Sequence, residues 1–426
     1  MSRICSILVL TFVWSAGCES SGTIVGDDEL VNCSRRPSHP RCVDSGGVPN
    51  DGGGGSRDRG SGAIDAGPID GGAPGIDGGP VATPSVFVST TGSDSAPCTS
   101  DAPCLTFQRA YAVAGDGQTI LVRAGTYPRQ EIAGGTKRVT YLGERGAIVY
   151  QLDNSANDVT FDGLEVDSRF DQVLGFHNAG ADGVTFRNGR IGNVTDEKGA
   201  LVSGSNFTFD NVEFHDVLVT DPLVHNECIY AIVVPGFTIR RSSFRTCATM
   251  DLFFTHGLWW DPVPPAYGNV TIENNVFAHS TMVGADTWHY YSLVMGQVGP
   301  SPDDPLDGWV VRNNTFEIGV ATDRTAVRSR WVGNIGGWDC LPGMTFSHNV
   351  GEACGPTDRS VTPNTSSATT TAPFGWRDPA HHDFHLAAGS VAIDAADPTD
   401  FPATDRDGRP RPVGAASDCG AYEYAP

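Results

Sequence analysis

A short pattern of alternating apolar and polar residues recurs along this chain. Its clearest copy is NVTIENNVF at 269–277, where apolar residues alternate with polar ones and an Asn-containing turn follows. Such alternation is typical of a β-strand with one buried face. Near-copies lie at 158–166, 183–191, 206–214, 236–244, 309–318 and 345–350. One copy cannot bury its apolar face alone, so the copies must stack on one another.

The turns between the short strands carry a second regularity. Asn recurs there, as Asn188, Asn211, Asn274, Asn275, Asn313 and Asn314. Short strands, one turn per copy and no helical periodicity between copies predict a parallel β-solenoid. Stacked on successive coils, the Asn side chains are expected to form hydrogen-bonded amide ladders. We therefore interpret these residues as structural rather than catalytic.

The segment before the first repeat has a different pattern. It contains a strand (VFVS, from residue 86), an amphipathic helix expected over about 105–114, and a second strand (TILVRAG). The first coil of a solenoid has an open end that must be covered. The helix is therefore predicted to be an amino-terminal cap.

Motifs at both ends of the repeats resemble β-helix proteins of the pectate-lyase superfamily. The opening carries GSD, APC and GDGQTILVRAGTY, and the closing segments DFHLAAGSVAIDAAD, DRDGRPRP and DCGAYEY resemble that family's carboxy-terminal signature. The resemblance covers about residues 85–424 and implies an all-β, right-handed parallel β-helix with an amino-terminal helical cap. It implies no single reaction, because the superfamily includes lyases, hydrolases and epimerases.

The first 84 residues read as leader and tether. Residues 1–18 have the features of an export signal, with Arg3, the apolar run ILVLTFVW and the end SAGC. AGC resembles a bacterial lipobox, which implies lipidation of Cys18 and anchoring at the outer membrane or cell surface. Cleavage near Ala16, with a periplasmic or secreted product, is the alternative. Residues 19–84 are rich in Gly, Asp and Pro and predict a disordered tether, which leaves 85–426 for the β-helix domain.

Charge and cysteine content narrow the partners and the compartment. The formal net charge is −22 and the only lysines are Lys137 and Lys198. Nucleic acid is therefore not expected as a partner, since phosphate contacts need clustered basic residues. A monomer that binds polysaccharide is expected instead.

Eleven cysteines favour an oxidising compartment. Cys33 with Cys42, Cys98 with Cys104 and Cys340 with Cys354 are close enough in sequence to form local disulfides. Cys228 and Cys247 lie about one coil apart and are expected either to be bonded or to stack as thiols. Cys419 is left without an obvious partner.

Residues able to do chemistry gather in three consecutive coils and the coil that follows. They are His225, Glu227, Tyr230, Asp251, Trp259, Trp260, Asp286, His289, Tyr290, Arg324 and Arg328. Outward residues of successive coils lie about 4.8 Å apart, so a column of them forms a site. We expect Glu227, Asp251 and either Asp286 or His289 to project from one face, with Tyr230 beside them.

This residue set fits β-elimination on a uronic-acid polysaccharide, which begins with loss of the proton next to a carboxylate. Lyases of the superfamily use stacked acids for Ca²⁺ and Lys or Arg as the base, but no lyase base motif is recognisable here. The roles this suggests are Arg328, His225 or His289 as base and Tyr230 or Tyr290 as acid. Glu227, Asp251 and Asp286 would be ligands of Ca²⁺ or partners of the substrate carboxylate. Trp259, Trp260, Tyr290 and Arg324 are expected to bind the sugar.

Two other functions use the same residues. A glycoside hydrolase would use two of the carboxylates as acid and as base or nucleophile. A surface carbohydrate-binding or adhesive solenoid would bind glycans through the aromatic loop without turnover.

The lipobox resemblance gives a test of location. Cys18→Ser is expected to move the protein from the membrane fraction to the soluble fraction, because the acylated side chain is lost. Fractionation followed by immunoblotting measures this, and a wild-type protein that is already soluble contradicts the anchor.

Overall fold

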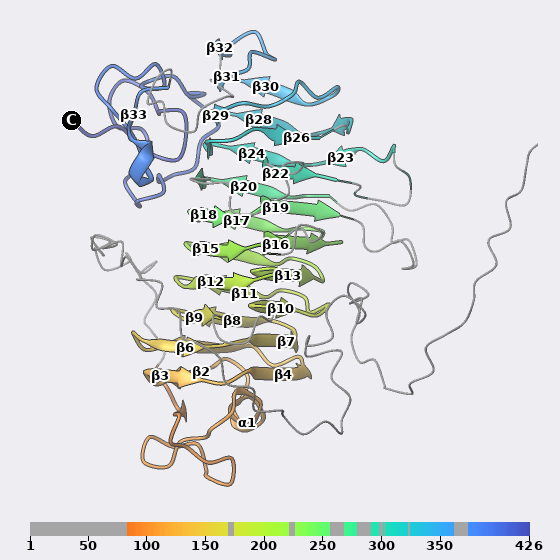
Figure 1. Cartoon of the computed structure of the whole chain (residues 1–426), viewed down its shortest axis with the longest axis vertical. Helices are drawn as coiled ribbons and strands as arrows, with labels where there is room; N and C mark the ends of the chain where they lie inside the picture. The colour runs from red at the N-terminus through yellow and green to blue at the C-terminus, as the bar shows by residue number, and fades with distance from the viewer. Residues whose placement is uncertain are drawn as a thin grey trace, which may run out of the picture. The chain divides into compact units, whose positions relative to one another are not determined.

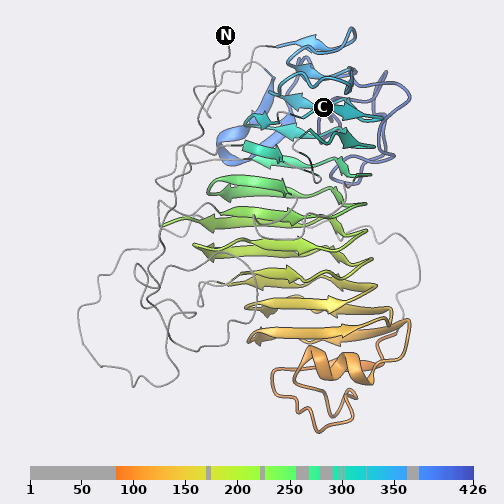
Figure 2. The same ribbon diagram turned by 90° about the vertical axis from the view of Figure 1, so that its right-hand side faces the viewer.

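The computed structural model describes most of the chain after residue 82. The described residues are 83–168, 174–220, 226–255, 268–278, 291–296, 298, 301, 303–322, 324–361 and 374–426. They belong to one compact unit, Gly71–Pro426. Within them the backbone passes repeatedly through three parallel sheets, here named A, B and C, in the order A, B, C for each coil (Figures 1 and 2). This is the parallel β-solenoid that the repeats predict, in the form of the right-handed parallel β-helix that the family resemblance implies.

Sheet A is formed by β1 (Val86–Val88), β2 (Gln118–Val122), β5 (Val139–Gly143), β8 (Val159–Asp162), β11 (Thr185–Arg187), β14 (Thr208–Asp210), β17 (Thr238–Arg240), β20 (Thr271–Glu273), β24 (Val310–Arg312), β28 (Arg330–Val332) and β30 (Thr345–Ser347). Sheet B is formed by β3 (Gly125–Tyr127), β6 (Ala147–Val149), β9 (Glu165–Asp167), β12 (Arg190–Thr195), β15 (Glu213–Leu218), β18 (Ser243–Cys247), β21 (Val276–Ala278), β25 (Thr315–Phe316), β29 (Ile335–Gly336), β31 (Val350–Gly351) and β32 (Arg359–Ser360).

Sheet C is formed by β4 (Gln130–Gly135), β7 (Leu152–Ala156), β10 (Phe176–Asn178), β13 (Ala200–Ser203), β16 (Glu227–Ile232), β19 (Met250–Thr255), β22 (Tyr291–Met295) and β26 (Val320–Ala321). Two small sheets pair β23 (Leu306–Asp307) with β27 (Ala326–Val327) and β33 (Trp376–Asp378) with β34 (Asp383–Leu386). The helical elements are α1 (Phe107–Val113) and the 3-10 turn η2 (Pro379–His381).

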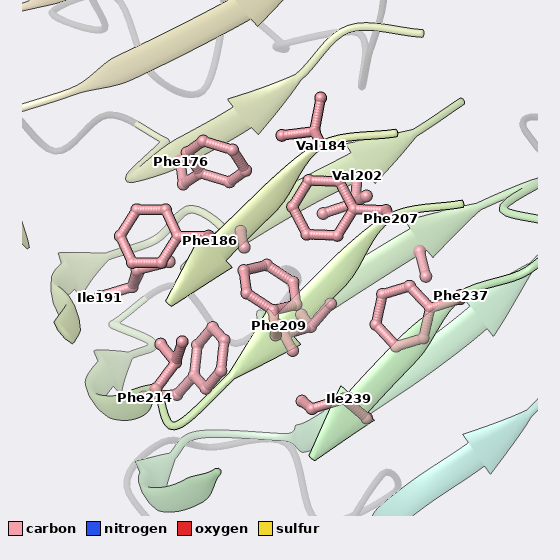
Figure 3. Close-up of a cluster of buried hydrophobic side chains, with 14 of the residues drawn as sticks. Phe176, Val184, Phe186, Ile191, Val202, Phe207, Phe209, Phe214, Phe237 and Ile239 are labelled. Atoms are coloured by element: carbon pink, nitrogen blue, oxygen red, sulfur yellow. The ribbon is translucent and has the colours of Figure 1, made fainter. Parts of the chain in front are cut away.

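The inward side chains of the three sheets fill a core of stacked aromatic and aliphatic residues (Figure 3). In sheet B, Phe214, Phe244, Phe277 and Phe316 stack face to face, with ring centroids 4.9, 4.7 and 4.7 Å apart. These distances match the spacing of neighbouring strands, so one residue type repeated at one position packs against itself. The apolar residues that alternate along the sequence are the ones that stack in this core.

A buried amide ladder connects the later coils of the chain, at the turn from sheet A to sheet B. The side-chain oxygens of Asn275, Asn314, Asn334 and Asn349 each accept the backbone N–H of the preceding coil, at 2.9 to 3.0 Å. Asp358 ends the series by accepting from the backbone N–H of Asn349. Each amide thus satisfies a backbone donor of another coil in a fully buried position.

The other four of the six turn Asn residues make two different kinds of contact. Asn188 and Asn211 do form an amide pair, 3.0 Å apart. Asn274 and Asn313 instead donate to the backbone oxygens of Thr404 and Asp418 in the carboxy-terminal segment. The expected amide ladders are therefore confirmed for Asn188 with Asn211 and for Asn275 with Asn314, and the expectation is wrong for Asn274 and Asn313. Asn188, Asn211, Asn274 and Asn313 all have a positive φ, so the difference comes from the carboxy-terminal segment, whose backbone oxygens lie beside Asn274 and Asn313.

Helix α1 closes the amino-terminal end of the coils, as expected. Thr106 caps it by accepting the backbone N–H of Arg109, and Phe107 stacks on Tyr141 of β5 with ring centroids 4.9 Å apart. Lys137 donates to carbonyl oxygens at the helix's carboxy-terminal end, including that of Ala114 at 2.8 Å. The cation therefore lies where the helix dipole is negative.

The carboxy-terminal segment, residues 374–426, packs against sheets A and B. Its apolar residues form a second cluster with Val276, Ile335 and Val350 of sheet B. Arg411 and Glu423 form a fully buried ion pair inside the segment, and Arg411 also donates to the side chain of Asn274. The upper coils of sheet B are thereby covered, as the contacts of Val276, Ile335 and Val350 show.

The amide ladder gives a stability prediction. Asn314→Ala removes the acceptor of two buried N–H groups of Asn275, and we expect a loss of about 3 kcal/mol. The midpoint of urea unfolding measures this. Thr345→Ala, on the exposed side of the nearby strand β30, is the control and should change the midpoint little. Equal effects of the two variants would contradict a structural role for the ladder.

The carboxy-terminal segment gives a pH prediction. Burial alone lowers the pKa of His385, but hydrogen bonds with Asp407 and Asp383 outweigh it and raise the pKa above 6.5. A raised pKa gives stability that is complete below the unfolded-state pKa and is lost as pH rises through the folded-state value. The stability difference between wild type and His385→Asn should therefore shrink when thermal unfolding is measured from pH 6 to pH 8. His381→Gln, at a side chain 82% exposed, is the control.

Candidate functional site

The outer face of sheet C carries one continuous column of side chains. Parallel pairing in register aligns one residue from each of seven consecutive strands, β4 to β22 (Figure 1). We call these residues the outer column: Glu131, Asp153, His177, Leu201, Tyr230, Phe253 and Val294. The residues between them in sequence point inward, as the full burial of Ile229 and Leu252 shows. The column therefore lies on the outside of the coils.

The first three residues of the outer column are polar and connected. The carboxylate of Asp153 accepts from Arg129 at 2.7 Å and from Gln151 at 3.2 Å, and it lies 3.4 Å from the Nδ1 of His177. Burial would raise the pKa of Asp153, but hydrogen bonds with His177 and Arg129 outweigh it and lower the pKa. Asp153 is therefore ionised at neutral pH. Glu131 lies one strand away and is exposed.

The middle of the outer column brings a lysine against an aromatic pair. The Tyr230 and Phe253 rings lie 5.2 Å apart, edge to face. The Nζ of Lys198 lies 5.5 Å from the centroid of the Tyr230 ring, and Lys198 is only 8% exposed. A hydrogen bond from the backbone of Gly199 to that of Glu227 places Lys198 beside the start of β16.

Sequence reasoning missed Lys198 as a site residue, because it lies in an earlier coil than Tyr230. A signal was present in the spacing. The repeats at 206 and 236 are 30 residues apart, and Lys198 precedes Glu227 by nearly the same interval. Residues separated by one repeat are neighbours in a solenoid. Lys198 therefore lies beside Glu227 and Tyr230.

Glu227 and Asp251 do not stack as expected. The register pairs Glu227 with Met250 and Ile229 with Leu252, so Asp251 stands one position further along its strand than Glu227. Since side chains alternate along a strand, the one-residue offset removes the shared outward face. Both residues are also fully buried. The expectation of an exposed stack of carboxylates from these two residues is therefore wrong.

The two arginines lie away from Tyr230. Arg328 forms a two-bonded ion pair with Asp307, beside the small sheet of β23 and β27, and its side chain is 77% exposed. The hydrogen bond and the charge of Asp307 raise the pKa of Arg328. An arginine so held keeps its proton, which disfavours its assignment as the base. Arg324 is half-buried between β26 and β27.

Several predicted site residues lie outside the described residues. They are His225, Trp259, Trp260, Asp286, His289 and Tyr290, and with them the lipidation residue Cys18 and the pair Cys33 and Cys42. Their assigned roles stay predictions. Among the residues that the structure describes, no group of three or more His, Cys, Asp or Glu is placed to hold a metal ion. The described donors do not by themselves form a Ca²⁺ site.

The disulfide predictions are confirmed within the β-helix. Cys98 bonds Cys104 and Cys340 bonds Cys354. For Cys228 and Cys247 the structure decides between the two alternatives in favour of a disulfide. It links β16 to the end of β18, and so it fixes the corner beside Glu227. Cys419 is a buried free thiol, and burial raises its pKa well above the ordinary value.

No helix in the described part is long and apolar enough to cross a bilayer.

The fold is similar to that of a solved pectate lyase. A structure of the pectate lyase Pel9A superposes with a TM-score of 0.50 and 18% sequence identity, over 81% of this chain and 97% of the lyase. The two proteins share the parallel β-helix fold. At this identity the likeness shows the fold alone.

Two further structures are less similar. A rhamnogalacturonan lyase gives a TM-score of 0.32 at 13% identity, over 63% of this chain and 68% of its own. A pectin methylesterase in complex with a hexasaccharide gives 0.33 at 12% identity, over 68% and 96%. No family model and no curated protein sequence matches the chain.

Proposed function

We propose that this chain is an exported polysaccharide-active protein of the lyase type, with its site on the outer face of sheet C around Lys198 and Tyr230. The observation that carries the proposal is the buried Lys198, whose Nζ lies against the Tyr230 ring. The shared fold with a pectate lyase supports the same substrate class. The three disulfides fit an exported protein.

The chemistry needs a base beside a weakly acidic carbon. Lysine can accept a proton only in its neutral form, and burial disfavours the charged form of an amine. In the elimination, Lys198 takes the proton from the ring carbon next to the substrate carboxylate. The electron pair of that C–H bond forms the new double bond, and the bond from the neighbouring carbon to the glycosidic oxygen breaks. The leaving oxygen takes a proton from the hydroxyl of Tyr230.

The steps above are those of this chain's own residues, and Ca²⁺ stays a prediction. A cation would neutralise the substrate carboxylate in the way that the superfamily resemblance implies. Glu227 and Asp251 are out of step with each other, and Asp286 lies outside the described residues. A hydrolase acting through Glu227 and Asp251 is disfavoured for the same reason, since it needs two carboxylates that face the substrate together.

Ultraviolet absorbance of unsaturated ends tests the proposal directly. The full-length protein should produce this absorbance from at least one polymer in a panel of uronic-acid polysaccharides. Lys198→Gln should lower the rate about 100-fold, the usual contribution of a general base, with an unchanged melting temperature. Lys137→Gln is the matched control, because Lys137 binds carbonyl oxygens at the end of α1 and lies away from Tyr230 in the fold.

Other outcomes separate the alternatives. New reducing ends without absorbance would indicate a hydrolase, and binding without any product would indicate a carbohydrate-binding solenoid. Full lyase activity in Lys198→Gln would rule out Lys198 as the base.

A further inference from the structure

The carboxy-terminal segment, residues 374–426, binds the coils through its last turn. The backbone oxygen of Asp418 accepts a hydrogen bond from the side chain of Asn313 at 3.1 Å. The thiol of Cys419 lies 3.0 Å from the backbone oxygen of His348. Asn313 and His348 both stand where the chain passes from sheet A to sheet B, in two different coils. Asp418 and Cys419 are therefore a point at which the segment docks on the solenoid.

Beside this contact the segment buries three carboxyl groups. Asp405, Asp418 and Glu423 are at most 1% exposed, and Arg411 is buried with them. Glu423 pairs with Arg411 and accepts the backbone N–H of Asp418 at 2.9 Å. Asp405 accepts the backbone N–H of Glu423 at 3.0 Å. Three carboxyl groups thus share one buried guanidinium, and holding all three as anions away from water is costly.

Protons on the carboxyl groups lower this cost. Burial and the charge of Glu423 raise the pKa of Asp418 to about 6. The backbone N–H groups of Asp394 and Tyr424, which donate to Asp418, and the buried guanidinium act against the increase without cancelling it. Burial also raises the pKa of Asp405. The docked segment therefore holds protons at a pH at which an exposed aspartate has lost its own.

A histidine within the segment responds to pH in the same direction. His385 of β34 lies between Asp383 and Asp407, whose carboxylate oxygens are 2.5 and 2.9 Å from its two ring nitrogens, and its ring stacks on Tyr422. Only the imidazolium form donates from both nitrogens, so protonation makes both contacts hydrogen bonds. Burial lowers the pKa of His385, but its hydrogen bonds with Asp407 and Asp383 raise it above 6.5.

His382, at the end of η2, acts in the opposite direction. Burial and the charges of Arg245 and His381 lower its pKa, and the charges of Asp216 and Glu213 only partly offset this. Protonation of His382 therefore favours release of the segment. Between pH 5 and pH 8 this group opposes the two aspartates and the histidine described above, so the net effect of raising the pH is to loosen the segment.

We propose that docking of the carboxy-terminal segment is controlled by pH: the segment binds sheets A and B tightly at acidic pH and loosens as the pH rises. A group that holds its proton more tightly in the docked state favours docking below its ordinary pKa, and the contribution is lost as pH rises through the docked-state value. For Asp418 the loss runs from 3.8 to about 6, and for His385 it lies above 6.5. This control does not depend on the site on sheet C.

Chemical labelling of Cys419 measures the docking. The thiol is fully buried and burial raises its pKa, so it reacts when the segment lifts from the coils. The full chain is pulsed with N-ethylmaleimide between pH 5 and pH 8, and the Cys419 peptide is quantified by mass spectrometry. Each rate is divided by the rate of the urea-unfolded chain at the same pH, which removes the reactivity of the thiol itself.

The corrected rate should rise about tenfold from pH 5 to pH 8. The part of the Asp418 transition above pH 5 spans about one pKa unit, and one unit is a tenfold change in the docking equilibrium. Asp418→Asn does not titrate and should lose most of the increase between pH 5 and pH 6. His385→Asn, at a partly exposed side chain, should lose the increase above pH 6.5, and it keeps the test open where Asp418→Asn does not fold.

The control is Asp101→Asn, which removes an exposed carboxylate near the amino-terminal cap and should label like the wild type at every pH. A corrected rate that stays constant or falls as the pH rises overturns the proposal, as does a Cys419 that is not labelled at pH 8. An increase that survives in both Asp418→Asn and His385→Asn overturns the role given to these two groups.

Discussion

Coil-to-coil register is the constraint on which the rest of this structure depends. The amide ladder of Asn275, Asn314, Asn334 and Asn349 joins backbone donors of one coil to side-chain acceptors of the next, in a buried place where an unpaired group would be costly. A coil cannot slide along its neighbour without breaking this set. The same register stacks the phenylalanines of sheet B and aligns the outer column of sheet C.

The carboxy-terminal segment and the candidate site lie on different sheets. The carboxy-terminal segment covers part of sheet B through the cluster that includes Val276 and Ile335. Asn274 and Asn313, at the turn between sheets A and B, bind the backbone of that segment. These contacts place the segment on sheets A and B. The outer column of sheet C meanwhile carries an ionised acid, a histidine, an aromatic pair and a nearby lysine.

Buried charge serves different purposes in the two regions. Arg411 and Glu423 satisfy one another and several backbone groups inside the carboxy-terminal segment, which is an arrangement that holds a chain in one conformation. Lys198 is instead held against an aromatic face at the edge of an outward column. This contact beside the outer column is the observation on which the function that we propose rests.

The sequence by itself determined the fold of the repeats. Alternation with period two, turn residues at a fixed place and a capping helix each follow from local chemistry, and the disulfides of Cys98 with Cys104 and of Cys340 with Cys354 follow from short spacing. For Cys228 and Cys247, about one coil apart, the spacing favoured a disulfide and left stacked thiols as the alternative. The clear repeats, however, cover the strands of sheet A and the turn into sheet B. They do not show which residues of sheet C face outward, because the strands of sheet C follow loops of unequal length.

The tertiary structure decided which residues of sheet C face outward, and with them the location of the candidate site. A single position separates the observed register from the one that would stack Glu227 on Asp251. Because side chains alternate along a strand, this one position changes the face on which a residue lies. The same register brought Lys198 from an earlier coil to Tyr230, a neighbourhood that depends on how many residues the intervening loops hold. Local pattern fixes which residues form strands, but only the stacked coils fix which residues meet.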